Sequence, residues 1–193
     1  MHIYTLETIN NSRVYHTVYF SCEETPLGPV WIASTSFGVC KLSLSTPGEQ
    51  EFLRWLNNTF PESDFVYDGD RHKPVVQVLS EYAAGQKLDL TLPLHLFGTD
   101  FQLRVWKELL GIPYGETVSY KELSGRMNSN PRAVGQANAR NPVAILVPCH
   151  RVVGASGKLT GYAGGLDMKN KLLQLETSNK PINCCEPLPS IKI

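Results

Sequence analysis

Residues 99–140 have the sequence TDFQLRVWKELLGIPYGETVSYKELSGRMNSNPRAVGQANAR, and this stretch decides the fold class of the second half of the chain. Thr99 is followed three residues later by Gln102, a spacing at which each side chain can cap the backbone of the other where a helix begins. Ser119 and Glu122 repeat this capping-box spacing further along. The sequence therefore predicts that one helix begins just after Thr99 and a second just after Ser119.

The second of these helices is followed closely by a third. It runs to about Met127, and the next helix begins at Pro131, directly after the N-cap residue Asn130. Two short helices joined by so tight a turn predict a helix-turn-helix. The helix over 131–140 has small residues where a core-packing helix normally has Leu or Ile. Its backbone can therefore approach either another helix or a DNA groove.

The first half of the chain follows strand periodicity instead. Two strand-like runs flank a turn within 27–45, and Cys40 falls on the buried phase of the second run. Helical spacing follows over 49–60 and again over 74–84, which Gly85 closes. The run LDLTLPLHL (88–96) places five Leu residues on one strand face, and the proline inside it predicts an edge strand.

Composition narrows the function classes. The chain of 193 residues has 18 Lys plus Arg and 18 Asp plus Glu, but residues 1–99 carry 6 basic and 11 acidic side chains, and residues 100–176 carry 10 basic and 6 acidic. Because a phosphate backbone responds to local charge, zero net charge does not exclude a nucleic-acid partner. The five cysteines lack metal-ligand spacing and favour a reducing compartment. No long apolar run or secretory pattern is found, so we expect no membrane segment.

The chemistry lies in residues 141–165, NPVAILVPCHRVVGASGKLTGYAGG. An apolar run leads to Cys149 and His150, and a thiol reacts as its thiolate when a base or cation is near. Neighbours on an extended chain point to opposite faces, so a direct contact, a bridging water and a purely structural cysteine all remain open. Tyr162 lies in a Gly/Ser-rich loop that suits a movable lid presenting one aromatic ring.

The pentapeptide PCHRV at 148–152 resembles the active-site signature of the O6-alkylguanine-DNA alkyltransferases, also called methylated-DNA–protein-cysteine methyltransferases. The resemblance extends over residues 99–176, through FQLRVWKELLGIPYGETVSYKEL, PRAVGQANARNPVAILVPCHRVV, GYAGG and KLLQLE. TPLGPVWIASTSFGVCKL at 25–42 resembles the N-terminal domain of that family more loosely.

The resemblance implies an α/β (α+β) fold in two domains. Residues 1–96 are expected to form a ribonuclease-H-like β-sheet domain with flanking helices. Residues 97–178 are expected to form a mostly helical, winged-helix-like domain for DNA binding and alkyl transfer, and 179–193 a tail.

The resemblance also implies roles for single residues. Cys149 is the acceptor that takes the alkyl group from O6 of guanine, His150 activates it through a bound water, and Glu176 orients and charges the imidazole. Asn141 holds the turn before the active-site segment. Tyr120 crowds the phosphate of the target nucleotide and lies near the base. The product is a thioether that no second group reverses, so the protein is expected to act once.

On the DNA side, the resemblance implies that Arg132 fills the gap left in the stack when the nucleotide rotates out of the duplex. Further DNA-binding residues are expected at Tyr120, Ala133, Gly135, Arg140 and Arg151, and substrate-pocket residues at Val152, Thr160, Tyr162 and Ala163. O6-methylguanine is the chief substrate expected, with O4-methylthymine as a second candidate.

The expected partner is double-stranded DNA, bound through its minor groove by a monomer. We expect a cytoplasmic protein, nucleoid-associated in a prokaryote or nuclear in a eukaryote, that needs no cofactor and no metal. Some relatives carry structural zinc, but the ligand set is not reproduced here by His2, His16, His72, His95, Cys22 and Cys40.

Three alternatives remain open from the sequence. The chain could be a non-enzymatic binder of alkylated bases, a cysteine hydrolase that uses Cys149 and His150, or a helix-turn-helix regulator whose cysteine is incidental. Transfer of an alkyl group from DNA to Cys149 would distinguish an alkyltransferase from all three alternatives.

Overall fold

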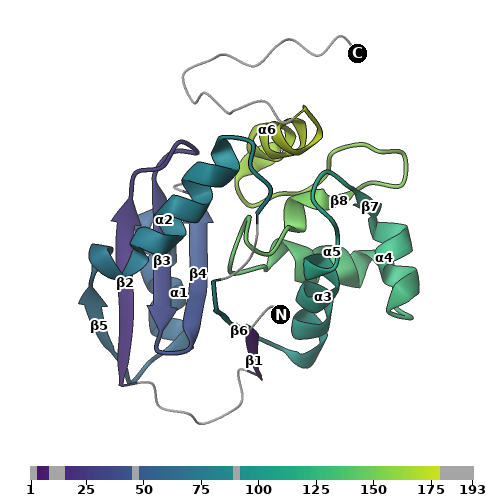
Figure 1. Cartoon of the computed structure of the whole chain (residues 1–193). Helices are drawn as coiled ribbons and strands as arrows, with labels where there is room; N and C mark the ends of the chain where they lie inside the picture. Colours follow the sequence, from purple (N-terminus) through teal and green to yellow (C-terminus); the bar gives the residue numbers. More distant parts are fainter. Residues whose placement is uncertain (1–3, 9–15, 45–47, 89–91, 179–193) are drawn as a thin grey trace.

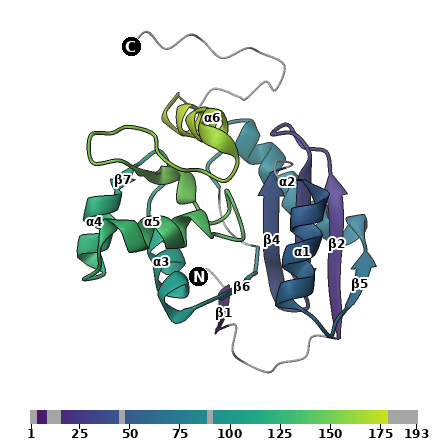
Figure 2. The same cartoon turned by 180° about the vertical axis from the view of Figure 1, so that it is seen from behind.

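The computed structural model describes residues 4–8, 16–44, 48–88 and 92–178, so His2 and the predicted tail over 179–193 lie outside the described residues. A sheet with one helix on each face stands beside a mostly helical half (Figures 1 and 2). No described helix is long and apolar enough to cross a membrane. The elements are β1 (Tyr4–Thr8), β2 (Thr17–Glu23), β3 (Val30–Thr35), β4 (Gly38–Leu44), α1 (Glu49–Thr59), β5 (Asp64–Tyr67), α2 (Gly69–Ala83), β6 (Leu94–Gly98), α3 (Asp100–Leu110), β7 (Val118–Ser119), α4 (Tyr120–Arg126), α5 (Pro131–Ala139), the 3-10 turn η1 (Cys149–Arg151), β8 (Val152–Val153) and α6 (Gly165–Ser178).

The six-stranded sheet has the order β1-β6-β4-β3-β2-β5. Its central strands β2, β3 and β4 pair antiparallel, whereas β1 with β6, β4 with β6 and β2 with β5 are parallel. Strand alternation sends side chains to both faces, and each face is covered: α1 packs through Phe52 and Leu56, and α2 through Val75 and Leu79. The predicted mixed fold with a sheet in the first half is confirmed.

The predicted hairpin within 27–45 is present as β3 and β4. Gly38 opens the second strand with a φ of 144°, a region that L side chains rarely adopt. A Cβ atom there would stand 2.3 Å from the carbonyl oxygen of Pro93, so only glycine fits. Cys40 is fully buried in β4, as its place in the alternation predicts.

Two sequence expectations in this half are wrong in detail. Helix α2 begins at Gly69 rather than at Pro74, because the Asp68 side chain caps it by accepting from the Arg71 amide (3.1 Å). Strand β6 is an interior strand, not an edge, since it lies between β1 and β4. Pro93 precedes the strand, so its missing N–H removes no hydrogen bond from the ladder.

The predicted helix starts of the second half are all observed. Thr99 and Gln102 form a capping box at α3, and Ser119 and Glu122 form one at α4. The Asn130 side chain caps α5 by accepting from a backbone amide at 2.9 Å. Helices α4 and α5 pack against each other as the predicted helix-turn-helix, and β7 and β8 form a small parallel pair beside them.

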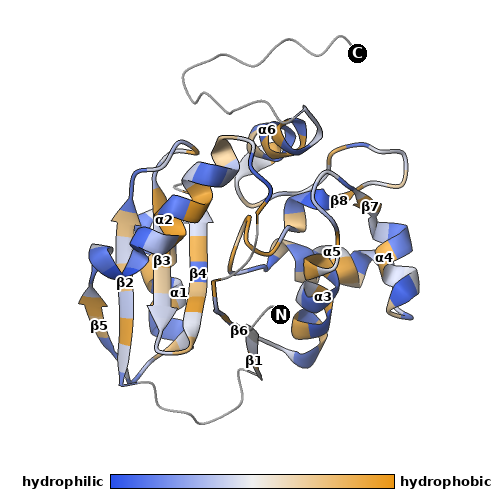
Figure 3. Cartoon of the chain, viewed as in Figure 1, coloured by the Kyte–Doolittle hydropathy of each residue, from blue (hydrophilic) through white to orange (hydrophobic). Residues whose placement is uncertain are grey.

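One apolar core runs through both halves. Its buried members include Ile32 and Leu79 from the first half and Trp106 and Leu172 from the second. Helices α2 and α3 show both hydrophilic and hydrophobic residues, as expected for helices with one buried face (Figure 3). The Trp106 indole N–H donates to the Ala137 carbonyl (2.9 Å) and ties α3 to α5.

Candidate active site

The segment before the cysteine is held by Asn141. Its side-chain N–H donates to the Val147 carbonyl (2.8 Å), and its oxygen accepts from the Val143 amide (3.1 Å). These two bonds close the irregular turn between α5 and η1, where Ile145 adopts a φ of 69°. Asn141 thereby fixes where the chain enters η1 and presents Cys149.

The sheet also supports this segment. The Leu42 amide in β4 donates to the Pro142 carbonyl (2.9 Å), and the Leu42 carbonyl accepts from the Ala144 amide (3.1 Å). The active-site turn is thus attached to an interior strand of the sheet, which gives it a rigid base.

The structure brings together the three predicted members of the catalytic set. Cys149 and His150 lie in η1, and Glu176 reaches His150 from α6. His150 Nε2 lies 2.8 Å from Glu176 Oε1, with both side chains fully buried. Nδ1 of His150 has no hydrogen-bond partner within the described part of the protein. Because the carboxylate is an acceptor, it favours the tautomer with the proton on Nε2 and an acceptor lone pair on Nδ1.

Several donors meet at the Glu176 carboxylate. Besides His150, it accepts from Arg151 through Nε (2.8 Å) and Nη2 (3.0 Å), from the Gly115 amide (3.1 Å) and from the Tyr82 hydroxyl (2.6 Å). Burial alone would raise the pKa of Glu176, but the hydrogen bonds and charges of His150 and Arg151 lower it to about 2. The carboxylate is therefore ionised at neutral pH and can stabilise a charged imidazole.

The prediction that Arg151 contacts DNA is wrong. Its side chain is buried, both its Nε and Nη2 atoms bond Glu176, and its Nη1 atom donates to the Ile112 carbonyl (2.6 Å). The resemblance implied a DNA contact for this arginine, but the Glu176 carboxylate on α6 pairs with the guanidinium inside the core.

The thiol of Cys149 is neutral in the resting site. Burial raises its pKa, against smaller lowering effects of the Asn141 side chain and the Lys169 charge. Burial also lowers the pKa of His150, so its imidazole is neutral and able to accept a proton at pH 7. The Tyr162 ring stands edge-on to the His150 ring at 6.5 Å between centroids and closes this side of the site.

Lys169 is a site residue that the sequence analysis missed. Its ammonium group is fully buried, and it donates to the carbonyls of Val152 (2.6 Å) and Thr160 (2.7 Å). Burial lowers its pKa to about 8. The lysine fastens both ends of the loop between β8 and Tyr162. The spacing 169, 172, 176 offers a signal, because it places Lys169 and Glu176 with Leu172 on one helix face.

Asn138 and Tyr82 were also missed. The Asn138 side-chain N–H lies within reach of both the Tyr120 hydroxyl (3.2 Å) and the Cys149 carbonyl (3.3 Å). Tyr82 comes from α2, and its place on the apolar stripe of that helix marks it only as a core residue. Nothing in the local sequence around Tyr82 connects it with His150.

A cavity of about 620 Å³ lies between the helix-turn-helix and the loop that Lys169 fastens. It is lined by Tyr120, Lys121, Pro131, Arg132, Gly135, Gly154, Ala155, Thr160 and Gly161. The Tyr120 hydroxyl is bonded by the Asn138 and Thr160 side chains, and burial raises its pKa. The Asn138 side chain bonds both Tyr120 in the cavity wall and the Cys149 carbonyl, so it links this cavity to the backbone of the cysteine.

The remaining predicted DNA-side residues lie on or near α5. Arg132 is exposed at its first turn, Ala133 and Gly135 are half-buried, and Arg140 is exposed at its C-terminal end. The carbonyl of Val152, a predicted substrate-pocket residue, accepts a hydrogen bond from the Lys169 ammonium group.

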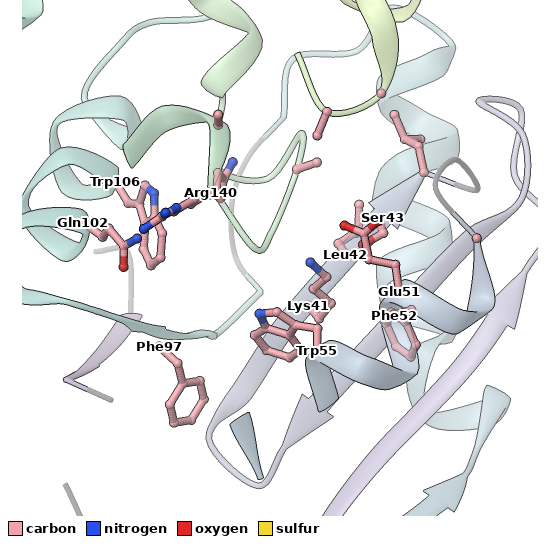
Figure 4. A pocket seen from close by; sticks show the side chains of 17 residues that line it. Lys41, Leu42, Ser43, Glu51, Phe52, Trp55, Phe97, Gln102, Trp106 and Arg140 are labelled. Carbon is pink, nitrogen blue, oxygen red and sulfur yellow. The ribbon is translucent and has the colours of Figure 1, made fainter. Parts of the chain in front are cut away.

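A second cavity, of about 470 Å³, separates β4 and α1 from the C-terminal end of α5. In Figure 4, Lys41 lies beside Trp55, while Arg140 lies in front of Trp106 across the gap. The Lys41 ammonium stands 5.0 Å from the centre of the Trp55 ring, a cation–π distance. Ala163, predicted in the substrate pocket, lines this second cavity.

Within the described residues, no cluster of His, Cys, Asp and Glu is arranged to hold a metal ion. Two of the histidines weighed as ligands bond to hydroxyls instead: His72 lies between Ser21 (2.8 Å) and Ser34 (2.9 Å), and His95 bonds Thr35 (2.7 Å).

Fold and site together define a cysteine-dependent protein in which a buried Cys-His-Glu set lies beside a helix-turn-helix. A family model described as 6-O-methylguanine DNA methyltransferase, DNA binding domain, matches residues 100–178. The methylated-DNA–protein-cysteine methyltransferase of Mycobacterium tuberculosis is 44% identical over 168 residues, covering 85% of this chain and 95% of that protein.

A second relative and a solved structure indicate the same family. The inducible methylated-DNA–protein-cysteine methyltransferase of Bacillus subtilis is 43% identical over 148 residues, covering 76% of this chain and 83% of that protein. The crystal structure of Mycobacterium tuberculosis OGT in complex with DNA matches with a TM-score of 0.73 and 40% identity, covering 86% of this chain and 96% of that one. The chain belongs to the methylated-DNA–protein-cysteine methyltransferase family.

Proposed function

We propose that this protein repairs DNA directly by moving the alkyl group from O6 of guanine, chiefly O6-methylguanine, to Sγ of Cys149. The observation that carries the proposal is the His150–Glu176 pair, in which a buried carboxylate holds Nε2 and leaves Nδ1 to act as a base. Membership of the methyltransferase family supports the same reaction.

The proposed reaction is a single displacement. His150 Nδ1 takes the thiol proton of Cys149 through a water molecule, and Glu176 stabilises the resulting imidazolium. The thiolate attacks the alkyl carbon, an S–C bond forms, and the C–O6 bond breaks with its electron pair left on guanine. A ring nitrogen of guanine takes up a proton, and the Tyr120 hydroxyl is the proposed donor. Tyr120 regains a proton from solvent, and the imidazolium releases its own.

The protein would reach O6 by extruding the nucleotide, because that atom is buried in the duplex. The cavity between the helix-turn-helix and the 154–161 segment is the proposed entry for the base. Arg132 lies exposed on its rim and would occupy the space that the nucleotide leaves. The small residues Ala133 and Gly135 allow α5 to approach the minor groove.

The wider setting is proposed on the same basis. The thioether at Cys149 is stable, and none of the described side chains around it offers a route to remove the alkyl group, so each chain should act once. We further propose that the protein works as a monomer on double-stranded DNA, in the cytoplasm of a prokaryote near the nucleoid or in a eukaryotic nucleus.

The test is incubation with a duplex that contains O6-methylguanine labelled in the methyl group. The expected result is transfer of about one labelled methyl per chain, located on the peptide that contains Cys149, with none in Cys149→Ala. Cys22→Ala removes a half-buried thiol in β2 of the sheet half and should transfer as the unchanged protein does.

Two outcomes would contradict the proposal. Repeated turnover on simple esters or amides would favour a cysteine hydrolase. Tight binding to the lesion with the label retained on DNA would favour a non-enzymatic binder of alkylated bases.

A further inference from the structure

Tyr82 connects the sheet half of the protein with the buried charges of the active site. It lies near the C-terminal end of α2, which runs up to α6 in both views (Figures 1 and 2). Its side chain is fully buried, and its hydroxyl oxygen lies 2.6 Å from Glu176 Oε1 and 3.3 Å from His150 Nε2.

The hydroxyl has one proton, and the two distances decide where it points. The carboxylate is the nearer and the charged acceptor, so Tyr82 donates to Glu176 Oε1 in a short charge-assisted bond. The same oxygen accepts from His150 Nε2 at 2.8 Å. Burial and the Glu176 charge both raise the pKa of Tyr82, so the phenol keeps this proton across the whole neutral range.

The groups that face the His150–Glu176 pair come from several elements. Arg151 belongs to η1, Lys169 to α6, Tyr162 to the loop between β8 and α6, Tyr114 to the turn after α3, and Tyr82 to α2. Among these described neighbours, Tyr82 alone comes from the part of the chain before β6. Among the hydrogen bonds that the described residues make to the His150 and Glu176 side chains, only those of Tyr82 come from the sheet half.

We propose that Tyr82 is a positioning residue for alkyl transfer, whose hydroxyl fixes the Glu176 oxygen that receives the His150 hydrogen bond and limits the negative charge which that oxygen presents to the imidazole. The inference rests on the proposed function. Because the phenol neutralises part of the carboxylate charge, it weakens the attraction for the imidazolium and keeps His150 neutral, ready to accept the thiol proton.

The test compares Tyr82→Phe with Tyr114→Phe. Both keep the ring and remove one hydroxyl, and the two rings are in edge contact at 6.1 Å. The Tyr114 hydroxyl has no hydrogen-bond partner within the described residues, so its loss is the matched control. The first readout is the titration midpoint of His150, followed by NMR of its ring carbon and nitrogen atoms without DNA. The second is the pH dependence of alkyl transfer.

In Tyr82→Phe the full Glu176 charge acts on the imidazole, so the His150 midpoint should rise by about one pH unit. The acid limb of the transfer rate should move with it, and at a pH on that limb the rate should fall about tenfold. Tyr114→Phe should keep both curves of the unchanged protein. Equal midpoints in all three proteins would overturn the proposal even where the unchanged protein transfers alkyl groups normally.

A measurement on the unchanged protein keeps the inference testable if Tyr82→Phe does not fold. The short bond to Glu176 should give a far-downfield, slowly exchanging hydroxyl proton with a contact to the His150 ring, and its absence contradicts the arrangement. Failure of the unchanged protein to take up any alkyl group would instead refute the proposed function. The NMR titration needs no DNA, so it tests the role of Tyr82 separately from alkyl transfer.

Discussion

Arg151 and Glu176 form a buried ion pair joined by two hydrogen bonds, from Nε to Oε2 at 2.8 Å and from Nη2 to Oε1 at 3.0 Å. Burying two charges is favourable only when their remaining donors and acceptors are also satisfied. Here the third guanidinium nitrogen donates to the Ile112 carbonyl at 2.6 Å, so η1, α6 and the end of α3 meet at one point. The Arg151–Glu176 ion pair, whose carboxylate orients His150, thus also holds these three elements together.

Arg151→Ala should destabilise the protein strongly, because it leaves the Glu176 charge and the Ile112 carbonyl buried without their partner. The expected loss is about 3–5 kcal/mol in the free energy of unfolding, measured by urea denaturation. Arg140→Ala removes an exposed guanidinium and should change stability by less than about 0.5 kcal/mol. Similar losses in both variants would contradict the buried ion pair.

Acid should destabilise the folded state through Glu176. Its folded pKa of about 2 lies below the ordinary value of 4.5, so its stabilising contribution is present above pH 4.5 and is lost as the pH falls toward 2. The shift corresponds to on the order of 3 kcal/mol. The lowered pKa of His150 acts in the same direction, since stability falls as the pH drops below its ordinary 6.5.

The measurement is the melting temperature from pH 7 to pH 3. Glu176→Gln should be less stable at pH 7 and should show a flatter decline below pH 4.5. An unchanged acid slope in that variant would show that other groups control the acid transition.

Arg132→Ala should slow repair in duplex DNA roughly tenfold or more, while reaction with the free alkylated base stays unchanged. The exposed side chain contributes only when it replaces a rotated nucleotide in the stack, a step that costs a few kcal/mol. Single-turnover transfer rates on both substrates provide the measurement. Arg104→Ala, an exposed cation on α3, serves as the charge control, and equal losses on duplex and free base would refute the wedge role.

Lys169→Met should loosen the loop between β8 and Tyr162, because the Val152 and Thr160 carbonyls lose their shared donor. We expect a stability loss of about 1–3 kcal/mol and faster hydrogen exchange of amides over 153–161. Lys171→Met, on the same helix but only partly buried, is the matched control. Unchanged exchange in Lys169→Met would show that the loop is held by other contacts.

The sequence by itself determined the features that depend on residues close together in the chain. The capping boxes at Thr99 and Ser119 and the cap at Asn130 join groups three residues apart, so spacing alone predicts them. The alternation around Cys40 predicts its burial for the same reason. The motif around Cys149, through its resemblance to a known family, supplied the acceptor and its partners.

Tertiary structure decided which distant faces meet. Tyr82 and Glu176 are 94 residues apart in the chain, and no local pattern encodes their contact. Arg151, expected on the DNA-binding surface, lies in the core because a carboxylate on α6 pairs with it. Strand β6 becomes interior because β1, far earlier in the chain, pairs alongside it. Such contacts arise from the packing of whole elements, whereas residue spacing specifies only hydrogen bonds and burial within one element.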